Sequence, residues 1–168
     1  MQNKYPKNRE YFKKLIAFAK EIIKLCNKND IHMVIYGSFA HFYHTKQNIN
    51  VNDIDVMIQK NDYPKFLKLL DEAKIEYKYK PKHEEIFIKK NALMIEVDEF
   101  GSKYNELLPN SNLKDYINID FYGESVNIID VKTIEKIYIS ANREDNSDSE
   151  KILMKTRAFE EYLGRKII

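Results

Sequence analysis

The sequence predicts an α/β (α+β) fold in which helices flank a mixed, twisted β-sheet and two further helices close the C-terminal end. Apolar residues recur at helical spacing near the N-terminus, short β-prone runs bounded by turn residues fill the middle, and helical periodicity returns at the end. With 168 residues, 43% of them hydrophobic, the chain fits a single domain over 1–168. Within it we expect a core over 1–130 and a helical segment over 131–168.

Charge, hydrophobicity and cysteine content limit the partners and the cellular compartment that the sequence favours. The 28 Lys and Arg against 26 Asp and Glu give a formal net charge of +2, too balanced to favour long nucleic acid or a membrane surface. No apolar stretch approaches the ~20 residues of a membrane span, and residues 1–9 carry no apolar signal core. The single Cys26 lies on an apolar helical stripe, which indicates a reduced, interior thiol. We therefore expect a cytoplasmic protein, and its oligomeric state is left open.

The first elements alternate helix and strand. Apolar residues over 12–26, with Asn8 available as a cap, predict an amphipathic helix. Residues 31–36 form a β-prone run that ends at Gly37, and Ser38 then opens a helix of no more than two turns. The sequence thus predicts a strand, a tight turn and a short helix in succession.

The next strand carries two acids. Residues 53–58 alternate acidic and aliphatic side chains, which places Asp53 and Asp55 on one strand face. Asp62 and Pro64 then mark the start of a helix. Further strands are expected over 75–79, 85–88, 92–100, 116–122 and 125–129, with a hairpin turn at Gly123-Glu124, and helices over 132–141 and 149–163.

The paired aspartates indicate a metal site. Two neighbouring carboxylates on one face repel each other, and a divalent cation between them relieves the repulsion. The motif of Asp53 and Asp55 contains no His or Cys, which favours Mg²⁺ or Mn²⁺, ions that complete their coordination with water and phosphate oxygens. Gly37 and Ser38, between a strand and a helix, offer backbone N–H groups and a hydroxyl to phosphate. Together these residues indicate metal-dependent phosphate chemistry.

The segments I-Y-G-S-F-A and N-D-I-D-V, with Asp53 placed 15 residues after Ser38, together resemble the nucleotidyltransferase superfamily, which is related to DNA polymerase β. The resemblance covers residues 31–58, where Asn52 takes the small polar position that often precedes the first aspartate. The layout is also similar to that of small lincosamide and aminoglycoside nucleotidyltransferases and of minimal or antitoxin-type members. The resemblance implies the nucleotidyltransferase fold.

The resemblance further implies a third acid on a later strand. The segment A-L-M-I-E-V-D-E-F supplies Glu96 and Asp98 on one strand face, and either could take this role. We favour Glu96 as the metal ligand beside Asp53 and Asp55, because apolar residues flank it on both sides. Asp98 has the shorter side chain that is more usual in this role. The alternative interpretation of both acids is a charged sheet edge that discourages strand pairing.

The reaction implied by the resemblance is transfer of a nucleoside monophosphate from an NTP to an acceptor hydroxyl, with Mg²⁺ or Mn²⁺ and release of pyrophosphate. Gly37 and Ser38 would hold the β- and γ-phosphates. The expected catalytic residues are Asp53, Asp55, Glu96 and Asp98. The acceptor could be a small molecule, such as an antibiotic, or a protein. The alternative function is an antitoxin-like binding module that keeps the fold and acts through a partner chain.

Two further expectations concern the surroundings of the site. In the similar proteins the last helices form a wall of the acceptor or nucleotide site, so Arg143, Asp145 and Asp148 are expected to face it. His41 and His44 lie one turn apart on the short helix, but no Cys or carboxylate lies near them at zinc-site spacing. We expect both histidines at the surface or beside the metal site rather than as ligands.

Overall fold

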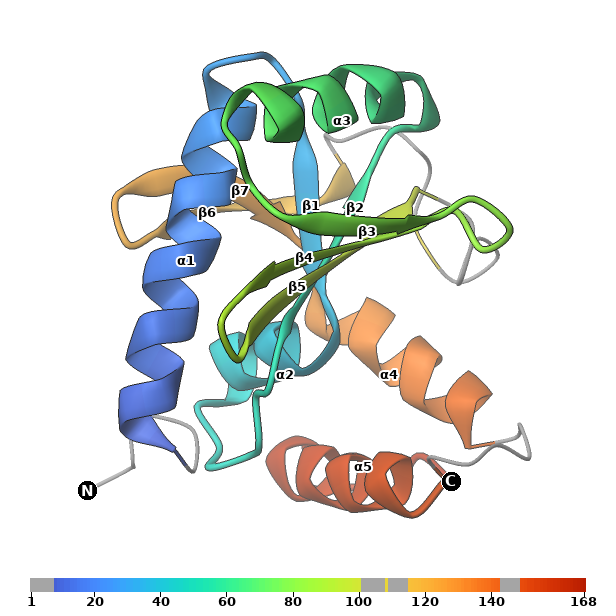
Figure 1. Ribbon diagram of the computed structural model, residues 1–168. Coiled ribbons are helices and arrows are strands. Elements are labelled where there is room, and N and C mark those ends of the chain that lie inside the picture. Colours follow the sequence, from blue (N-terminus) through green and yellow to red (C-terminus); the bar gives the residue numbers. More distant parts are fainter. Residues whose placement is uncertain (1–7, 101–107, 109–114, 143–148) are drawn as a thin grey trace.

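The computed structural model describes residues 8–100, 108, 115–142 and 149–168. Its seven-stranded mixed sheet has the order β3-β4-β5-β2-β1-β7-β6 (Figure 1). The strands are β1 (Met33–Tyr36), β2 (Ile54–Ile58), β3 (Tyr77–Lys80), β4 (Glu85–Lys90), β5 (Leu93–Glu99), β6 (Ile117–Phe121) and β7 (Glu124–Ile128). The helices are α1 (Arg9–Asn27), α2 (Gly37–Thr45), α3 (Tyr63–Glu72), α4 (Val131–Ala141) and α5 (Ser149–Leu163), with a 3₁₀ turn η1 (Lys60–Asp62). The predicted α+β class with a mixed sheet is confirmed.

The centre of the sheet brings three separate strands into register. β1 pairs antiparallel with β2, so that Tyr36 lies opposite Asp55. β2 pairs parallel with β5, which places Asp55 opposite Glu96. Because side chains of paired residues share a sheet face, this register brings the acids of β2 and β5 together.

The helices are unevenly distributed around the sheet. In Figure 1, α2, α4 and α5 gather at one end of the strands, and α3 lies at the opposite end. α1 packs its predicted apolar stripe against the sheet, with Phe12, Leu15 and Cys26 at most 1% exposed. Asn8 caps this helix as predicted, since its Oδ1 accepts the Tyr11 N–H at 3.0 Å.

One hairpin turn and one helix start differ in detail from the sequence-based prediction. Phe121 pairs with Glu124, so Tyr122 and Gly123 form the hairpin turn instead of Gly123 and Glu124. Both turn residues have positive φ, 52° and 94°, as a type I′ turn requires. Asp62 takes the N-cap position of α3 but makes no side-chain cap, because its backbone is already helical where η1 runs into α3.

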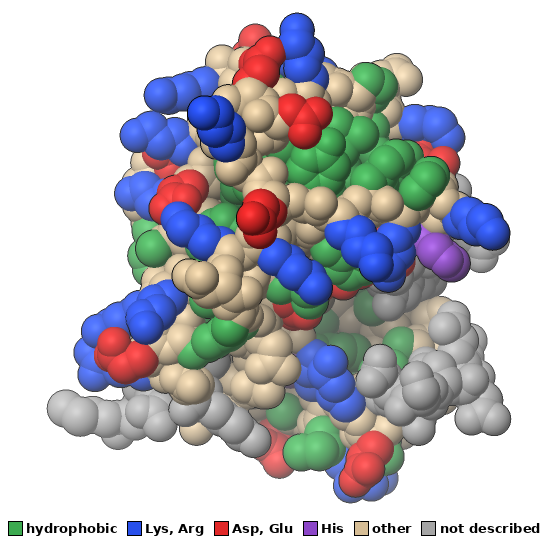
Figure 2. Space-filling model, in the orientation of Figure 1, with side chains coloured by type: hydrophobic (Ala, Val, Ile, Leu, Met, Phe, Trp, Pro, Cys, Tyr) green, Lys and Arg blue, Asp and Glu red, His purple; other side chains and the backbone are tan. Residues whose placement is uncertain are grey.

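Charged side chains of both signs lie at the surface. On the face shown in Figure 2, Lys and Arg are interspersed with Asp and Glu. Several form pairs, such as Lys90 with Glu21 at 2.9 Å and Lys60 with Glu84 at 3.2 Å. Among the described helices, none combines the length and apolarity that crossing a bilayer demands.

His41 lies at the centre of the helical layer, which corrects the expectation of a surface histidine. Its side chain is 0% exposed. The ring packs edge-on against Phe159 of α5 and Tyr138 of α4, with centroid separations of 5.3 and 5.6 Å. The sequence around His41 does not show that α4 and α5 pack over this short helix and cover the histidine. His44 is half-buried, and its Nε2 lies 2.8 Å from the Ile129 carbonyl.

Hydrogen bonds fix the state of this imidazole. Gln47 Nε2 donates to the Ala158 carbonyl of α5 at 2.5 Å, so Gln47 Oε1 is left to accept from His41 Nε2–H at 2.8 Å. His41 Nδ1 then accepts the Tyr138 hydroxyl at 2.7 Å. Burial lowers the pKa of His41 to about 4, and nearby Lys155 adds to this effect. The ring is therefore neutral at pH 7, with both nitrogens satisfied.

The buried neutral His41 predicts acid destabilisation. Its pKa is about 4 in the folded protein against 6.5 as the ordinary value, so the unfolded chain binds a proton that the folded chain excludes. Stability from this group is complete above pH 6.5 and is lost as the pH falls towards 4, by about 3 kcal/mol. Urea unfolding at pH 7 and pH 4 measures this loss in the wild type and in His41→Gln. An equal pH dependence in the two proteins would contradict the assignment.

Candidate active site

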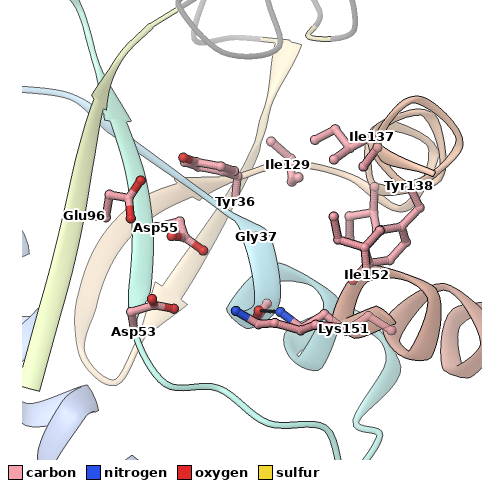
Figure 3. A pocket seen from close by; sticks show the side chains of 14 residues that line it. Tyr36, Gly37, Asp53, Asp55, Glu96, Ile129, Ile137, Tyr138, Lys151 and Ile152 are labelled. Carbon is pink, nitrogen blue, oxygen red and sulfur yellow. Dashed lines mark hydrogen bonds between the residues drawn. The ribbon is translucent and has the colours of Figure 1, made fainter. Parts of the chain in front are cut away.

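Three carboxylates converge at the centre of the sheet. Asp53 directly precedes β2, Asp55 lies within β2, and Glu96 lies on the adjacent β5. One oxygen from each lies within 4.8 Å of the others, and Figure 3 shows the three side chains turned into the same pocket. A hard divalent cation requires oxygen ligands grouped in this way. The expectation that Asp53 and Asp55 share a face agrees with this arrangement.

The turn from β1 into α2 lies directly against these acids. Gly37 has φ +65°, and a Cβ built on it would lie 1.9 Å from Asp55 Oδ2. Any side chain here would displace the carboxylate, so glycine serves both the left-handed backbone and the close approach. No side chain caps the start of α2, and its first turn has no acidic residue. Gly37 and Ser38 line the pocket, so the first N–H groups of α2, which no side chain caps, are candidate donors for an anion.

The electrostatics of the three acids favour the binding of a cation. Burial raises the pKa of Asp55 well above its ordinary range, and the neighbouring charges of Asp53 and Glu96 raise it further. Burial and Glu96 likewise raise the pKa of Asp53, against the opposing effect of Lys151 and Lys155. A bound divalent cation would favour the ionised form of all three acids. The donor set thus fits Mg²⁺ or Mn²⁺ by charge, by oxygen chemistry and by grouping.

Asp98 lies outside this triad. Its side chain is 1% exposed, and the Tyr36 hydroxyl donates a hydrogen bond to its Oδ2. Burial and the surrounding acids raise the pKa of Tyr36, which keeps its proton on the phenol. Asp98 groups instead with Glu96 and Glu85, within 4.8 Å of one another. Of the two acids proposed for the third position, Glu96 alone belongs to the group that contains Asp53 and Asp55.

Two lysines that the sequence analysis did not select complete the polar part of the pocket. Lys151 and Lys155 of α5 line it, and Lys155 Nζ donates to Ser38 Oγ. Their spacing of four residues, which puts both on one helix face, is the signal that could have found them. The expected Arg143, Asp145 and Asp148 lie outside the described residues.

The rest of the pocket is apolar. Its volume is about 260 Å³, and α4, α5 and the end of β7 form a wall opposite the acids (Figure 3). The wall residues are Ile129, Ile134, Ile137, Tyr138, Ala141 and Ile152. The pocket therefore has three parts: a triad of acids, an anion-facing turn with two lysines, and a largely apolar wall.

Comparison with solved structures identifies the fold. The chain matches ANT(2″)-Ia in complex with adenylyl-2″-tobramycin with a TM-score of 0.64 at 10% identity, over 90% of both chains. It matches an antigenic nucleotidyltransferase-like protein from Paracoccidioides brasiliensis with a TM-score of 0.60 at 14% identity, over 86% of this chain and 74% of that one. It also matches the lincosamide antibiotic adenylyltransferase LnuA, lincomycin-bound, with a TM-score of 0.56 at 9% identity, over 84% and 95%.

No protein-family model matches the sequence, and no curated protein matches it either. The similarity is therefore one of three-dimensional structure. The chain has the nucleotidyltransferase fold, and the resemblance drawn from residues 31–58 is confirmed at the level of the fold. This resemblance extends well beyond the motif, because the matched regions cover at least 84% of this chain in all three cases.

The close contact at Gly37 predicts an unusually costly substitution. Gly37→Ala combines left-handed strain, about 1–2 kcal/mol, with displacement of the Asp55 carboxylate, on the order of 1–3 kcal/mol more. Gly164→Ala is the matched control, because Gly164 has a similar φ of +67° but nothing within 4 Å of the added Cβ. We expect the first variant to lose both stability and Mn²⁺ affinity, and the second to lose stability only. Denaturant unfolding and Mn²⁺ titration by EPR measure the two effects, and equal losses would contradict the contact.

Proposed function

We propose that the protein is a metal-dependent nucleotidyltransferase that transfers NMP from an NTP to a hydroxyl of a small-molecule acceptor and releases pyrophosphate. The observation that carries the proposal is the meeting of the Asp53, Asp55 and Glu96 carboxylates with the Gly37-Ser38 turn in one pocket. Neither feature is specific alone. Their combination provides ligands for a hard cation and donors for phosphate at adjoining places.

The acids would hold the cation. Asp53, Asp55 and Glu96 are the proposed ligands of Mg²⁺ or Mn²⁺, since their oxygens group together and Asp98 is engaged with Tyr36. When bound, such an ion neutralises charge on the triphosphate and makes the α-phosphorus more electrophilic. The repulsion among the three carboxylates favours its binding.

The start of α2 would hold the triphosphate. Its first-turn N–H groups and the Ser38 hydroxyl are donors for the β- and γ-phosphates of the NTP. Lys155, which donates to Ser38, and Lys151 add positive charge to the same pocket. These groups bind and orient the donor nucleotide, and they favour the departure of pyrophosphate by neutralising its charge.

In the reaction, the acceptor oxygen would attack the α-phosphorus as the bond to the β-phosphate bridging oxygen breaks. The acceptor proton would pass to a carboxylate of the triad, with Glu96 as the candidate because it lies on a different strand from the aspartates. The largely apolar wall on α4 and α5 supports a compact, partly apolar ligand next to this centre. Two structural neighbours are complexes with an adenylylated aminoglycoside and with lincomycin, which supports a small hydroxyl-bearing acceptor.

The proposal predicts a large effect of Asp53→Asn. Removal of one ligand charge should reduce nucleotidyl transfer by on the order of 10³-fold, because the electrostatic contribution dominates such reactions. Release of pyrophosphate from each of the four NTPs, with a pool of aminoglycoside and lincosamide acceptors, measures the activity. Asp71→Asn is the control, since Asp71 lies on α3 and bonds Tyr77 outside the pocket.

Wild-type turnover by Asp53→Asn would contradict the assignment of the triad. Failure of the wild type to bind Mg²⁺ with a non-hydrolysable NTP would favour the binding module instead. Calorimetry distinguishes the enzyme from the binding module. For an enzyme, we expect the NTP affinity to be lost when Asp53 and Asp55 are both replaced by alanine.

A second prediction separates the two candidates for the third ligand. Glu96→Gln should lower Mn²⁺ affinity at least about tenfold, because it removes a charge from the triad. Asp98→Asn should leave Mn²⁺ affinity close to that of the wild type and lower the unfolding midpoint, because it weakens a buried hydrogen bond with Tyr36. Mn²⁺ titration by EPR and thermal unfolding read the two effects. The reverse pattern would transfer the ligand role to Asp98.

A further inference from the structure

Helices α2 and α5 meet in two successive helical turns. In the first turn, Lys155 Nζ of α5 donates to Ser38 Oγ of α2. In the second, His41 of α2 packs against Phe159 of α5 with a centroid separation of 5.3 Å. On α2, Ser38 and His41 are three residues apart. On α5, Lys155 and Phe159 are four residues apart. The two contacts are therefore separated by about one turn on each helix. A displacement at the second contact therefore changes the first.

α5 packs on the core through Phe159, with Ala158 and Leu163 partly buried beside it, and hydrogen bonds add to this small apolar contact. Of its residues with a described side chain, only Thr156 and Phe159 are buried. Asn142 Nδ2 bonds Thr156 Oγ1 at 2.7 Å, and Gln47 Nε2 bonds the Ala158 carbonyl at 2.5 Å. The second of these bonds ties α5 to the segment that follows α2. A helix with so little apolar burial depends on such polar contacts for its register.

His41 orients the glutamine that makes this bond. Gln47 presents its amide N–H to Ala158 only if its oxygen faces His41 Nε2–H, at 2.8 Å. The Tyr138 hydroxyl, donating to His41 Nδ1 at 2.7 Å, keeps the ring proton on Nε2. We call Tyr138, His41, Gln47 and the Ala158 carbonyl the His41 network. Its donors and acceptors run in one direction, from α4 through α2 to α5.

We propose that His41 is a positioning residue for the triphosphate site, which through the His41 network fixes α5 at the register that holds Lys155 against Ser38. This inference rests on the proposed function, because its expected consequence is a change in triphosphate binding. The His41 side chain lies outside the lining of the pocket that contains the acids. It acts through the lysine, and loss of the network moves the Lys155 ammonium away from the place that the β- and γ-phosphates occupy.

Gln47→Glu tests the network with little change of shape. The carboxylate still accepts from His41 but cannot donate to the Ala158 carbonyl, so α5 loses its tie. We expect the dissociation constant of a non-hydrolysable NTP to rise about tenfold, and kcat to fall as well, because a displaced Lys155 also neutralises less charge on the departing pyrophosphate. Tyr138→Phe, which removes only the hydroxyl donated to His41, should act in the same direction.

A double-mutant cycle shows whether the effect passes through the lysine. If it does, Lys155→Met weakens NTP binding and the added Gln47→Glu weakens it no further. Multiplicative effects of the two changes would overturn the proposal. Glu135→Gln is the matched control, because Glu135 pairs with Arg165 at 2.7 Å and ties α4 to the residues after α5 away from the network. It should leave NTP affinity unchanged. Wild-type affinity in Gln47→Glu with a lowered unfolding midpoint would reduce His41 to a structural role.

A distance measurement separates this inference from the proposed function. Spin labels on cysteines introduced at the exposed positions Lys14 of α1 and Glu161 of α5 report where α5 lies, since the native Cys26 is buried and burial raises its pKa to about 12. We expect pulsed EPR to show a shifted or broadened distance in Gln47→Glu. An unchanged distance would overturn the positioning role even if NTP binds. An absence of NTP binding by the wild type would overturn the proposed function instead.

Discussion

The approach of the Asp55 carboxylate to Gly37 is the constraint on which the site depends. β1 and β2 place Tyr36 opposite Asp55, so the next residue of the chain must turn over the aspartate side chain. Only a residue without a Cβ fits there, because the added atom would lie 1.9 Å from Asp55 Oδ2. One steric fact therefore brings a carboxylate and the N-terminus of α2 into contact. An oxygen ligand for a cation and donors for an anion become neighbours.

The sheet maintains an arrangement that its charges oppose. Carboxylates in a partly buried pocket repel one another, and burial alone already disfavours their ionised forms. The apolar side chains between them hold the register, since Ile54, Val56, Ile95 and Val97 are at most 1% exposed. Their burial contributes roughly 25 cal/mol per Å² of apolar surface. Binding of a divalent cation would release the repulsion, so the same strain favours the proposed ligand.

Local patterns predicted part of this site, and only those parts that need no knowledge of packing. Alternation along 53–58 was enough to place Asp53 and Asp55 on one face, and a strand ending in Gly37 was enough to predict the turn. The apolar residues flanking Glu96 favoured it over Asp98, but the difference in their positions comes from the register of the β2–β5 pair, which places Glu96 opposite Asp55. Both acids have the same periodicity in the sequence. Their neighbours differ, because Tyr36 bonds one of them from another strand.

Interactions between helices were the least predictable. Lys155 and His41 acquire their surroundings only when α5 folds over α2, and no spacing within either helix states that they meet. The sequence therefore predicts His41 at the surface or beside the metal site, whereas it lies buried at the centre of the helical layer. The acids and the lysines of the pocket are consequently held in place by different interactions. The acids are held by a sheet with a large apolar core, whereas the lysines lie on a helix that buries little and relies on hydrogen bonds. Local opening should therefore release α5 before it disturbs the triad.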